Sequence, residues 1–129
     1  MMFTLPWPSS TLSPNRRAHW AVLAKARKTA RRQAYMAVLS QLATSGVPKP
    51  RAPAGPLAVH LLFVAPDRRP YDRDNLLARM KAALDGVADA LGYDDSRVAH
   101  FSVRQAEKVE RPGYVLVQVG PDDGAALMQ

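Results

Sequence analysis

With 129 residues, the chain is long enough for one domain, and it contains no cysteine, which excludes disulfide bonds and cysteine-based zinc sites. Its longest apolar run, Leu57–Ala65, is far shorter than the roughly 20 residues of a membrane span, and its N-terminus lacks the pattern of a secretory signal, so we expect a cytoplasmic protein without a membrane partner. The formal net charge is +7 and the pI is near 10.3, which favours polyanions such as nucleic acids as partners.

The first part of the chain predicts a short strand and a long basic helix. Thr4–Trp7 is compatible with a strand stopped by prolines, and turn-forming residues follow it. From Arg16 or Arg17 to about Thr44, apolar residues recur at three- and four-residue steps, which indicates an amphipathic helix that stops at Gly46. The first 51 residues contain nine Lys or Arg and no acidic residue, so this part of the chain carries a uniform positive charge.

The middle of the chain predicts a linker, a buried strand and a second helix. Val47–Pro56 is rich in proline and is interpreted as a linker within the domain. Leu57–Val64 is a short apolar run between turn signals, which indicates a buried strand. Asp74 is an N-cap candidate for a helix over Leu76–Leu91, which carries an apolar stripe and ends at Gly92.

Two more strands complete the pattern. Val98–Glu107 alternates loosely, Tyr114–Val119 alternates strictly, and the turn between them favours a hairpin. The order strand, helix, strand, helix, strand, strand predicts an α/β (α+β) fold, in which a single mixed sheet of about four strands packs against two main helices. We expect one domain over residues 1–129, with a flexible tail at residues 120–129.

Two aspartates near the middle of the chain indicate a site for a divalent cation. Asp72 and Asp74 are two residues apart, and in extended backbone such residues point to the same side. Two converging carboxylates repel each other, and a hard cation such as Mg²⁺, which prefers carboxylates and water, relieves that repulsion. A second pair, Asp94 and Asp95, follows the second helix. If the sheet brings that turn beside Asp72, three carboxylates surround one site.

The helix between the two acidic pairs carries further charged residues. Asp74, Lys81 and Asp85 follow one another at steps of seven and four, which places them on one stripe beside the apolar one. Each feature also has an ordinary structural explanation: a surface loop for the first pair, a turn for the second, and a surface ion pair for the Lys and Asp one turn apart. The combination, in a basic chain, favours a metal site over these separate explanations.

The acidic segment resembles a known family. D-R-D-N-L-L, beginning at Asp72, is followed by K-A-A-L-D-G and then by Y-D-D-S-R-V, and this series resembles the RusA Holliday-junction endonucleases. The opening L-P-W-P-S-S-T-L-S-P-N-R-R-A-H-W also resembles that family, and the likeness extends from Leu5 to about Val119. The resemblance implies a homodimeric enzyme that resolves four-way DNA junctions by paired phosphodiester hydrolysis, in recombination and repair. It implies Mg²⁺ as cofactor, with Mn²⁺ as a substitute, and no nucleotide cofactor.

The resemblance also assigns roles by position. The metal-site aspartates fall on Asp72, Asp74 and Asp95, and the family lysine falls on Lys81, which would stabilise negative charge on the reacting phosphate. In the family pattern the lysine lies one turn beyond the second aspartate, where this chain has Ala78. Lys81 is on the same face, about 5 Å further along the helix.

The remaining site residues are expected to support the metal ligands or to contact DNA. Asn75, Asp85 and Asp94 are candidates for the surroundings of the metal site. His19 and Trp20 could stack on an exposed base, although such a Trp more often belongs to the core. Basic residues of the first helix and of the segment before the aspartates are the expected phosphate contacts of a nucleoid-associated protein: Arg16, Arg17, Lys25, Lys28, Arg31, Arg32, Arg68, Arg69 and Arg73.

Two other functions remain open. A non-catalytic basic DNA-binding protein would explain the charge but not the acidic pairs, and it predicts that loss of Asp72 has no effect on binding. A Mg²⁺ nuclease with a different branched-DNA substrate, or a nucleotide phosphohydrolase, would explain both the positive charge and the acidic pairs. No nucleotide-binding loop of the Walker type is present, which weakens the nucleotide version.

Overall fold

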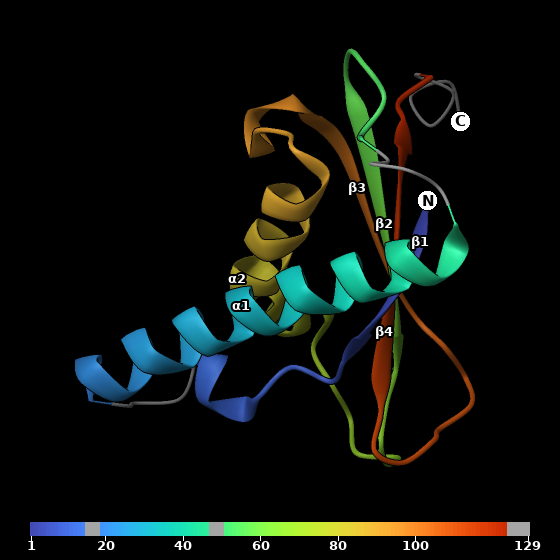
Figure 1. Ribbon diagram of the computed structural model, residues 1–129. Helices are drawn as coiled ribbons and strands as arrows, with labels where there is room; N and C mark the ends of the chain where they lie inside the picture. Colours follow the sequence, from blue (N-terminus) through green and yellow to red (C-terminus); the bar gives the residue numbers. More distant parts are fainter. Residues whose placement is uncertain (15–18, 47–50, 124–129) are drawn as a thin grey trace.

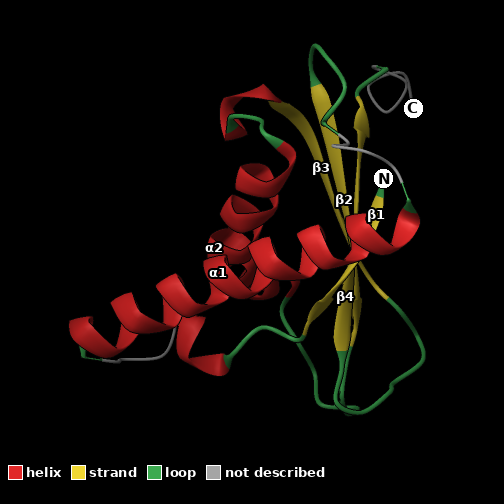
Figure 2. Cartoon of the chain, in the orientation of Figure 1, coloured by secondary structure: helices red, strands yellow, loops and turns green. Residues whose placement is uncertain are grey.

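The computed structural model describes residues 1–14, 19–46 and 51–123, and it has the mixed α+β architecture that the sequence predicts (Figures 1 and 2). Within those residues, a four-stranded sheet packs against two long helices. The elements in chain order are β1 (Met2–Pro6), the short helix η1 (Ser10–Leu12), α1 (Trp20–Ser45), β2 (Leu57–Val64), α2 (Arg73–Leu91), the short helix η2 (Asp95–Arg97), β3 (Val98–Gln105) and β4 (Tyr114–Pro121).

The sheet has the strand order β1-β4-β2-β3. β2 and β3 are parallel and are joined through α2, whereas β4 lies between β1 and β2 and is antiparallel to both. The two helices lie on the same side of the sheet, as Figure 1 shows with the sheet seen edge-on. This arrangement leaves β1 and β3 as the edge strands.

The prediction that the last two strands form a hairpin is wrong. β3 pairs with β2, and β4 pairs with the other side of β2, so the two strands are not neighbours. The connection between them passes the end of β2, where the backbone N–H groups of Ala106 and Glu110 donate to the carbonyls of Phe63 and Ala65. An alternating pattern specifies a strand and its buried face, but not the strand it pairs with.

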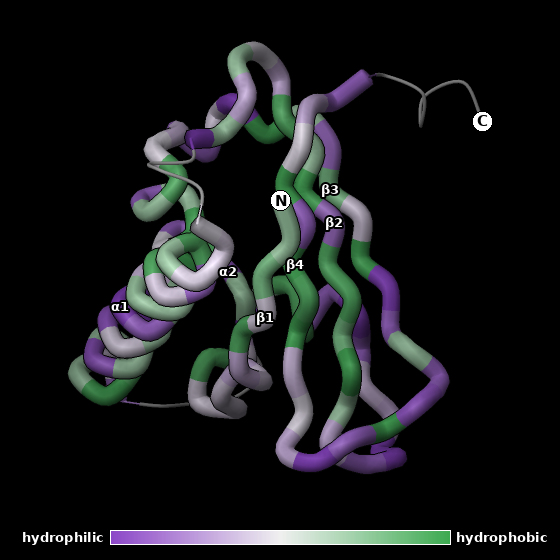
Figure 3. The backbone as a smooth tube through the Cα atoms, turned by 45° about the vertical axis from the view of Figure 1, so that its right-hand side comes forward, coloured by the Kyte–Doolittle hydropathy of each residue, from purple (hydrophilic) through white to green (hydrophobic). Residues whose placement is uncertain are grey.

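The core lies between the sheet and the helices. Inward-facing residues alternate along the strands, as in Val59, Leu61 and Phe63 of β2, and they meet the apolar stripes of α2 and α1. In Figure 3 hydrophobic colours recur along the strands of the sheet. Burial of these apolar surfaces is the main source of the fold's stability.

The two helices cross at Gly86 of α2. A Cβ atom built on Gly86 would lie 2.1 Å from the carbonyl oxygen of Arg31 and 3.1 Å from the Cβ atom of Ala34, both in α1. The absence of a side chain therefore permits the close approach of the helix backbones. Beside this crossing, the guanidinium of Arg31 donates to both carboxylate oxygens of Asp89, at 2.7 and 2.9 Å.

The helix ends correct two expectations. The N-cap of α2 is Asp72, whose side chain accepts from the backbone N–H of Asn75, whereas Asp74 lies in the first turn. Asp72 is the N-cap because its carboxylate accepts the backbone N–H of Asn75, three residues further on, which is the usual capping geometry. α1 begins at Trp20 with His19 as its N-cap, and Arg16 and Arg17 lie outside the described residues.

The expected helix stops are confirmed, because Gly46 and Gly92 both have the left-handed backbone conformation that ends a helix, with φ of 73° at each. The predicted bounds of β2 are confirmed as well, while β1 begins two residues earlier than expected. Among the described residues, no helix is both long enough and apolar enough to cross a bilayer.

Candidate functional site

Asp72 and Asp74 both lie on the surface at the N-terminal end of α2, Asp72 as the N-cap and Asp74 in the first turn. Both side chains are exposed, and Asp72 uses Oδ1 to accept the backbone N–H of Asn75 at 3.2 Å. The side-chain carbonyl of Asn75 accepts the hydroxyl of Ser13 at 3.0 Å. Asn75 therefore ties this turn to the segment that follows η1, so its role here is to position the turn that carries the two aspartates.

The loop before α2 and the first residue of α2 place arginines next to the two aspartates in the chain. Arg68, Arg69 and Arg73 are all exposed. Arg69 pairs with Asp67 at 3.3 Å, and the hydroxyl of Tyr71 donates to the same carboxylate at 2.8 Å. The hydrogen bond from Tyr71, followed by the one from the backbone of Arg69, lowers the pKa of Asp67. Asp67 is thus an organiser of this loop that sequence reasoning missed.

The second acidic pair lies in η2. The Asp94 side chain caps η2 by accepting the backbone N–H of Ser96 at 2.9 Å, and hydrogen bonds from Ser96 lower the pKa of Asp94. Asp95 lies in the first turn of η2 and is exposed. Arg97 donates to the carbonyls of Pro53 and Gly55, which fixes η2 against the segment before β2.

Within one chain, Asp95 does not reach Asp72. Asp72 follows the end of β2, whereas Asp95 precedes the start of β3, and the two strands are parallel, so the two residues lie at opposite ends of the sheet. α2 lies between them, and its 19 residues span about 28 Å. Over residues 1–14, 19–46 and 51–123, no three His, Asp or Glu side chains are grouped closely enough to hold a metal ion. The described part of a single chain therefore does not bring the three expected ligands to one site.

The middle of α2 joins a different set of charges. Lys81, Asp85 and Asp95 line a groove of about 310 Å³ beside β3, whose apolar walls include Leu84 and Phe101. Tyr93 also lines this groove, and burial, followed by the nearby Asp85 and Asp95 carboxylates, raises its pKa to about 12. The structure thus places three of the expected site residues, Lys81, Asp85 and Asp95, in one groove, which Asp72 and Asp74 do not line.

The basic residues of α1 face two sides. Lys28 and Arg31 line a groove of about 500 Å³ together with Lys81 and Asp85, whereas Lys25 lines a separate cavity. Arg31, expected to contact phosphate, is instead engaged by Asp89, and this partnership raises its pKa. Arg32 is exposed. A pairing between residues 58 positions apart cannot be read from the sequence of either helix.

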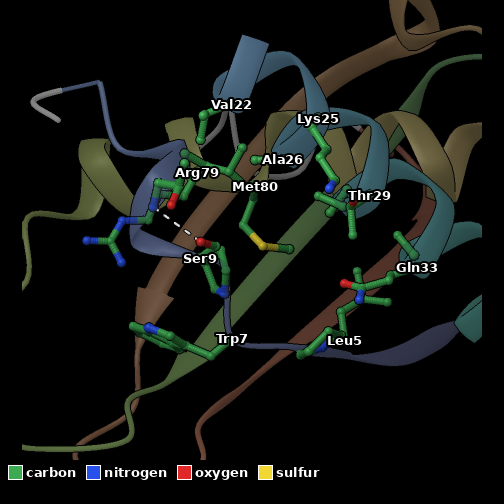
Figure 4. Close-up of a pocket in the computed structure, with 17 residues that line it drawn as sticks. Leu5, Trp7, Ser9, Val22, Lys25, Ala26, Thr29, Gln33, Arg79 and Met80 are labelled. Carbon is green, nitrogen blue, oxygen red and sulfur yellow. Dashed lines mark hydrogen bonds between the residues drawn. The ribbon is translucent and has the colours of Figure 1, made fainter. Parts of the chain in front are cut away.

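The separate cavity has a volume of about 450 Å³ and lies between the N-terminal segment and the two helices. Figure 4 shows Trp7, Lys25 and Met80 around it, from three different parts of the chain. Trp7 packs edge-on against Phe63 and Tyr71, with ring centroids 5.9 and 5.2 Å away. Sequence reasoning missed this cavity because no single segment forms its walls.

The aromatic pair at the start of α1 is not part of the core. Trp20 is 76% exposed, and its ring lies 5.5 Å from that of His19, so the interpretation of Trp20 as a core residue is wrong. The other two histidines, His60 and His100, are distant in sequence but lie on adjacent strands, with ring centroids 5.4 Å apart.

No protein-family model matches the chain. The chain is 43% identical over 118 residues to an uncharacterized protein of Xylella fastidiosa (strain Temecula1), and the match covers 90% of this chain and 73% of that protein. Identity at this level over most of both chains establishes common descent and a common fold. The chain therefore belongs to the same family as this Xylella fastidiosa protein.

Proposed function

We propose that the protein is a Mg²⁺-dependent endonuclease of the RusA type, which cuts four-way DNA junctions in the cytoplasm. The observation that carries this proposal is the pair of exposed carboxylates, Asp72 and Asp74, at the start of α2, next in the chain to exposed arginines. A protein that only binds DNA gains nothing from acidic groups beside phosphates, because like charges repel. A cation between carboxylate and phosphate reverses the sign of that interaction.

The donor chemistry of the two residues fits a hard cation. Asp72 uses one carboxylate oxygen to cap α2, which leaves its other oxygen for a metal, and Asp74 contributes a second exposed carboxylate. Mg²⁺ is commonly held by one or two carboxylates together with water and substrate phosphate. The positive end of the α2 dipole also reduces the cost of placing two negative groups there.

When bound, Mg²⁺ would supply an activated water and neutralise charge on the reacting phosphate. The exposed guanidinium groups of Arg68 and Arg73 would hold the phosphate of the strand to be cut. Lys81 lies seven residues beyond Asp74, or about 10 Å along α2. In one chain, Lys81 would therefore hold a phosphate other than the one at Asp72 and Asp74.

The DNA-binding surface would extend from the site onto α1. Lys25, Lys28 and Arg32 are exposed on this helix, and none of them has an acidic partner among the ion pairs of the described residues. Contacts of this kind position the duplex without reading its sequence. We expect binding that weakens steeply with salt and shows little sequence preference.

The test is cleavage of a labelled synthetic four-way junction with Mg²⁺, beside a linear duplex of the same sequence. Asp72→Asn and Asp74→Asn remove a charge and keep a polar side chain, and asparagine is also a good N-cap, so the fold is retained. Asp123→Asn is the matched control, because it removes an exposed acid elsewhere. Paired nicks in the junction alone, lost in both site variants and kept in the control, are expected. Uncut junction with the wild-type protein would refute the proposal.

One observation favours a non-catalytic alternative. The described part of a single chain does not bring the three expected carboxylates to one site, and the two at the start of α2 would hold a metal ion less tightly than three. A DNA-binding protein without nuclease activity predicts tight junction binding, no cutting, and unchanged affinity in Asp72→Asn. Flap and three-way substrates in the same assay separate a junction resolvase from a nuclease with a different branched substrate.

A further inference from the structure

The face of the sheet opposite the two helices carries a pair of histidines. Figure 1 shows both helices on one side of the sheet, so no described helix covers the other side. His60 of β2 points to that uncovered side, because its neighbours Val59 and Leu61 are buried on the helix side and side chains alternate along a strand. His100 and Ser102 of the adjacent strand β3 share this face, since Ser102 is the register partner of His60. Both histidines are half-buried.

The separation of the two imidazole rings fits two ligands of one metal ion. The ring centroids of His60 and His100 are 5.4 Å apart, with an angle of 59° between the ring planes. A zinc–nitrogen bond of about 2.0–2.1 Å places a ring centroid about 3.2 Å from the metal, so two imidazoles at the tetrahedral angle have centroids about 5 Å apart. The pairing of β2 with β3 holds the two rings close to this separation before any metal binds.

A hydrogen bond orients the ring of His60. Nδ1 of His60 lies 2.5 Å from the hydroxyl oxygen of Ser102. This bond uses Nδ1, so Nε2 is the ring nitrogen that remains for a metal. Histidines that bind a metal commonly have such a partner on the second nitrogen, which fixes the tautomer and the orientation of the ring. With a metal on Nε2, Nδ1 carries the proton and donates it to Ser102.

Oxygen ligands are available beside His60 to complete the coordination. His60 and Ser102 line a hollow of about 370 Å³ on this face, together with Gln118 of β4. Gln118 is the register partner of His60 on the other side of β2, and its side-chain amide carries a carbonyl oxygen. A zinc ion bound by fewer than four protein ligands takes water in the open positions. The hollow is large enough to admit that water.

The chemistry of these ligands selects a transition metal over Mg²⁺. Among the described residues that line the hollow, none is acidic and Arg104 is the one charged residue. Imidazole nitrogen suits Zn²⁺, Ni²⁺ and Cu²⁺, whereas Mg²⁺ is held by carboxylates and water. Arg104 repels any cation, so the affinity of this site comes from the metal–nitrogen bonds and not from a negative field.

We propose that His60 and His100 together bind one Zn²⁺ or a chemically similar divalent transition metal, with Ser102 as a positioning residue. The site is separate from Asp72 and Asp74, which lie at the start of α2 on the helix side of the sheet. It is also independent of the proposed nuclease function. Because the ion joins β2 to the edge strand β3 and binds only the folded chain, Zn²⁺ should raise the Tm of the protein.

The site is tested by calorimetric titration of Zn²⁺ into the untagged full chain, with excess Mg²⁺ to occupy the carboxylates of α2. We expect one Zn²⁺ per chain, and no saturable binding in His60→Gln or His100→Gln. Ser102→Ala should weaken binding roughly tenfold or more, because the ring of His60 loses its outer partner. His19→Asn is the matched control, since it removes the third histidine and keeps a good N-cap for α1.

A second measurement uses the wild-type chain, so it does not depend on how the variants fold. Ni²⁺ is paramagnetic, and substoichiometric Ni²⁺ should broaden the imidazole proton NMR signals of His60 and His100 before those of His19. A wild-type protein that binds no Zn²⁺, or histidine variants that bind it as tightly as the wild type, would overturn the proposal. Loss of Zn²⁺ binding in His19→Asn, or broadening of all three histidines alike, would overturn it as well.

Discussion

Replacing Gly86 with alanine tests whether the crossing of the two helices depends on the missing side chain. The new Cβ atom would lie 2.1 Å from the backbone carbonyl of Arg31, and backbone cannot rotate away as a side-chain tip can. The helices must therefore separate, which weakens the packing of α1 on α2. Overpacking of this kind costs about 1–3 kcal/mol, and alanine's better helix propensity recovers up to about 1 kcal/mol.

We expect the Gly86→Ala variant to lose roughly 1–2 kcal/mol of unfolding free energy, or about 3–8 °C in Tm for a domain of this size. Urea unfolding followed by circular dichroism measures the first quantity and a thermal scan the second. Gly120→Ala is the control, because a Cβ atom at Gly120 meets nothing within 4 Å and no left-handed backbone is involved. A Gly86→Ala variant as stable as the wild-type protein would refute the crossing geometry.

Three further predictions concern charge. The Asp89→Asn variant should lose less than about 1 kcal/mol at neutral pH, because the pair with Arg31 is partly exposed. The hydrogen bond from Arg31 lowers the folded-state pKa of Asp89. The contribution of the pair to stability is therefore present above the unfolded-state pKa of about 4 and disappears as the pH falls through the folded-state pKa. Urea unfolding from pH 7 to pH 3 should show the unfolding free energies of the variant and the wild-type protein converging. Spectrophotometric titration should reveal one tyrosine that ionises near pH 12 and is missing in Tyr93→Phe. The raised pKa of Tyr93 contributes stability that is lost between about pH 10 and 12. A Tyr93→Phe variant that instead loses a tyrosine ionising near pH 10 would contradict the burial of Tyr93. For Lys28→Gln, the slope of log Kd for junction DNA against log salt concentration should fall by about one, because one phosphate contact is lost. An unchanged slope would show that Lys28 does not contact the DNA.

The sequence predicted the elements better than their arrangement. The bounds of β2 and the ends of both helices follow from local signals, namely an apolar run and two glycines that adopt left-handed backbone. Such local signals do not identify the strands beside β4. β2 pairs with β3 on one side, so β4 can pair with β2 only on its other side. Only the topology of the whole sheet leaves the space between β1 and β2 for β4.

For the candidate site as well, the sequence predicted the local features but not the distances between elements. Asp72 and Asp74 are two residues apart at the start of α2, so their place at the same end of this helix is local and was predictable. The distance from Asp72 to Asp95 depends on the direction of β3 relative to β2, which no pattern of spacing encodes. The pairing of Arg31 with Asp89 depends on how α1 crosses α2, and it gives one of the expected phosphate contacts an acidic partner.

The double use of Asp72 has a consequence for how this protein could lose its chemistry. The Asp72 side chain caps the N-terminus of α2 by accepting the backbone N–H of Asn75. An asparagine, serine or threonine side chain would accept the same N–H nearly as well. Folding alone therefore tolerates several residues at this position, whereas a divalent cation requires the carboxylate. On the proposed nuclease function, a relative with asparagine at position 72 would keep the fold but lose DNA cleavage. An aspartate at position 72 in relatives would then indicate a demand of the proposed chemistry, because folding alone does not require it.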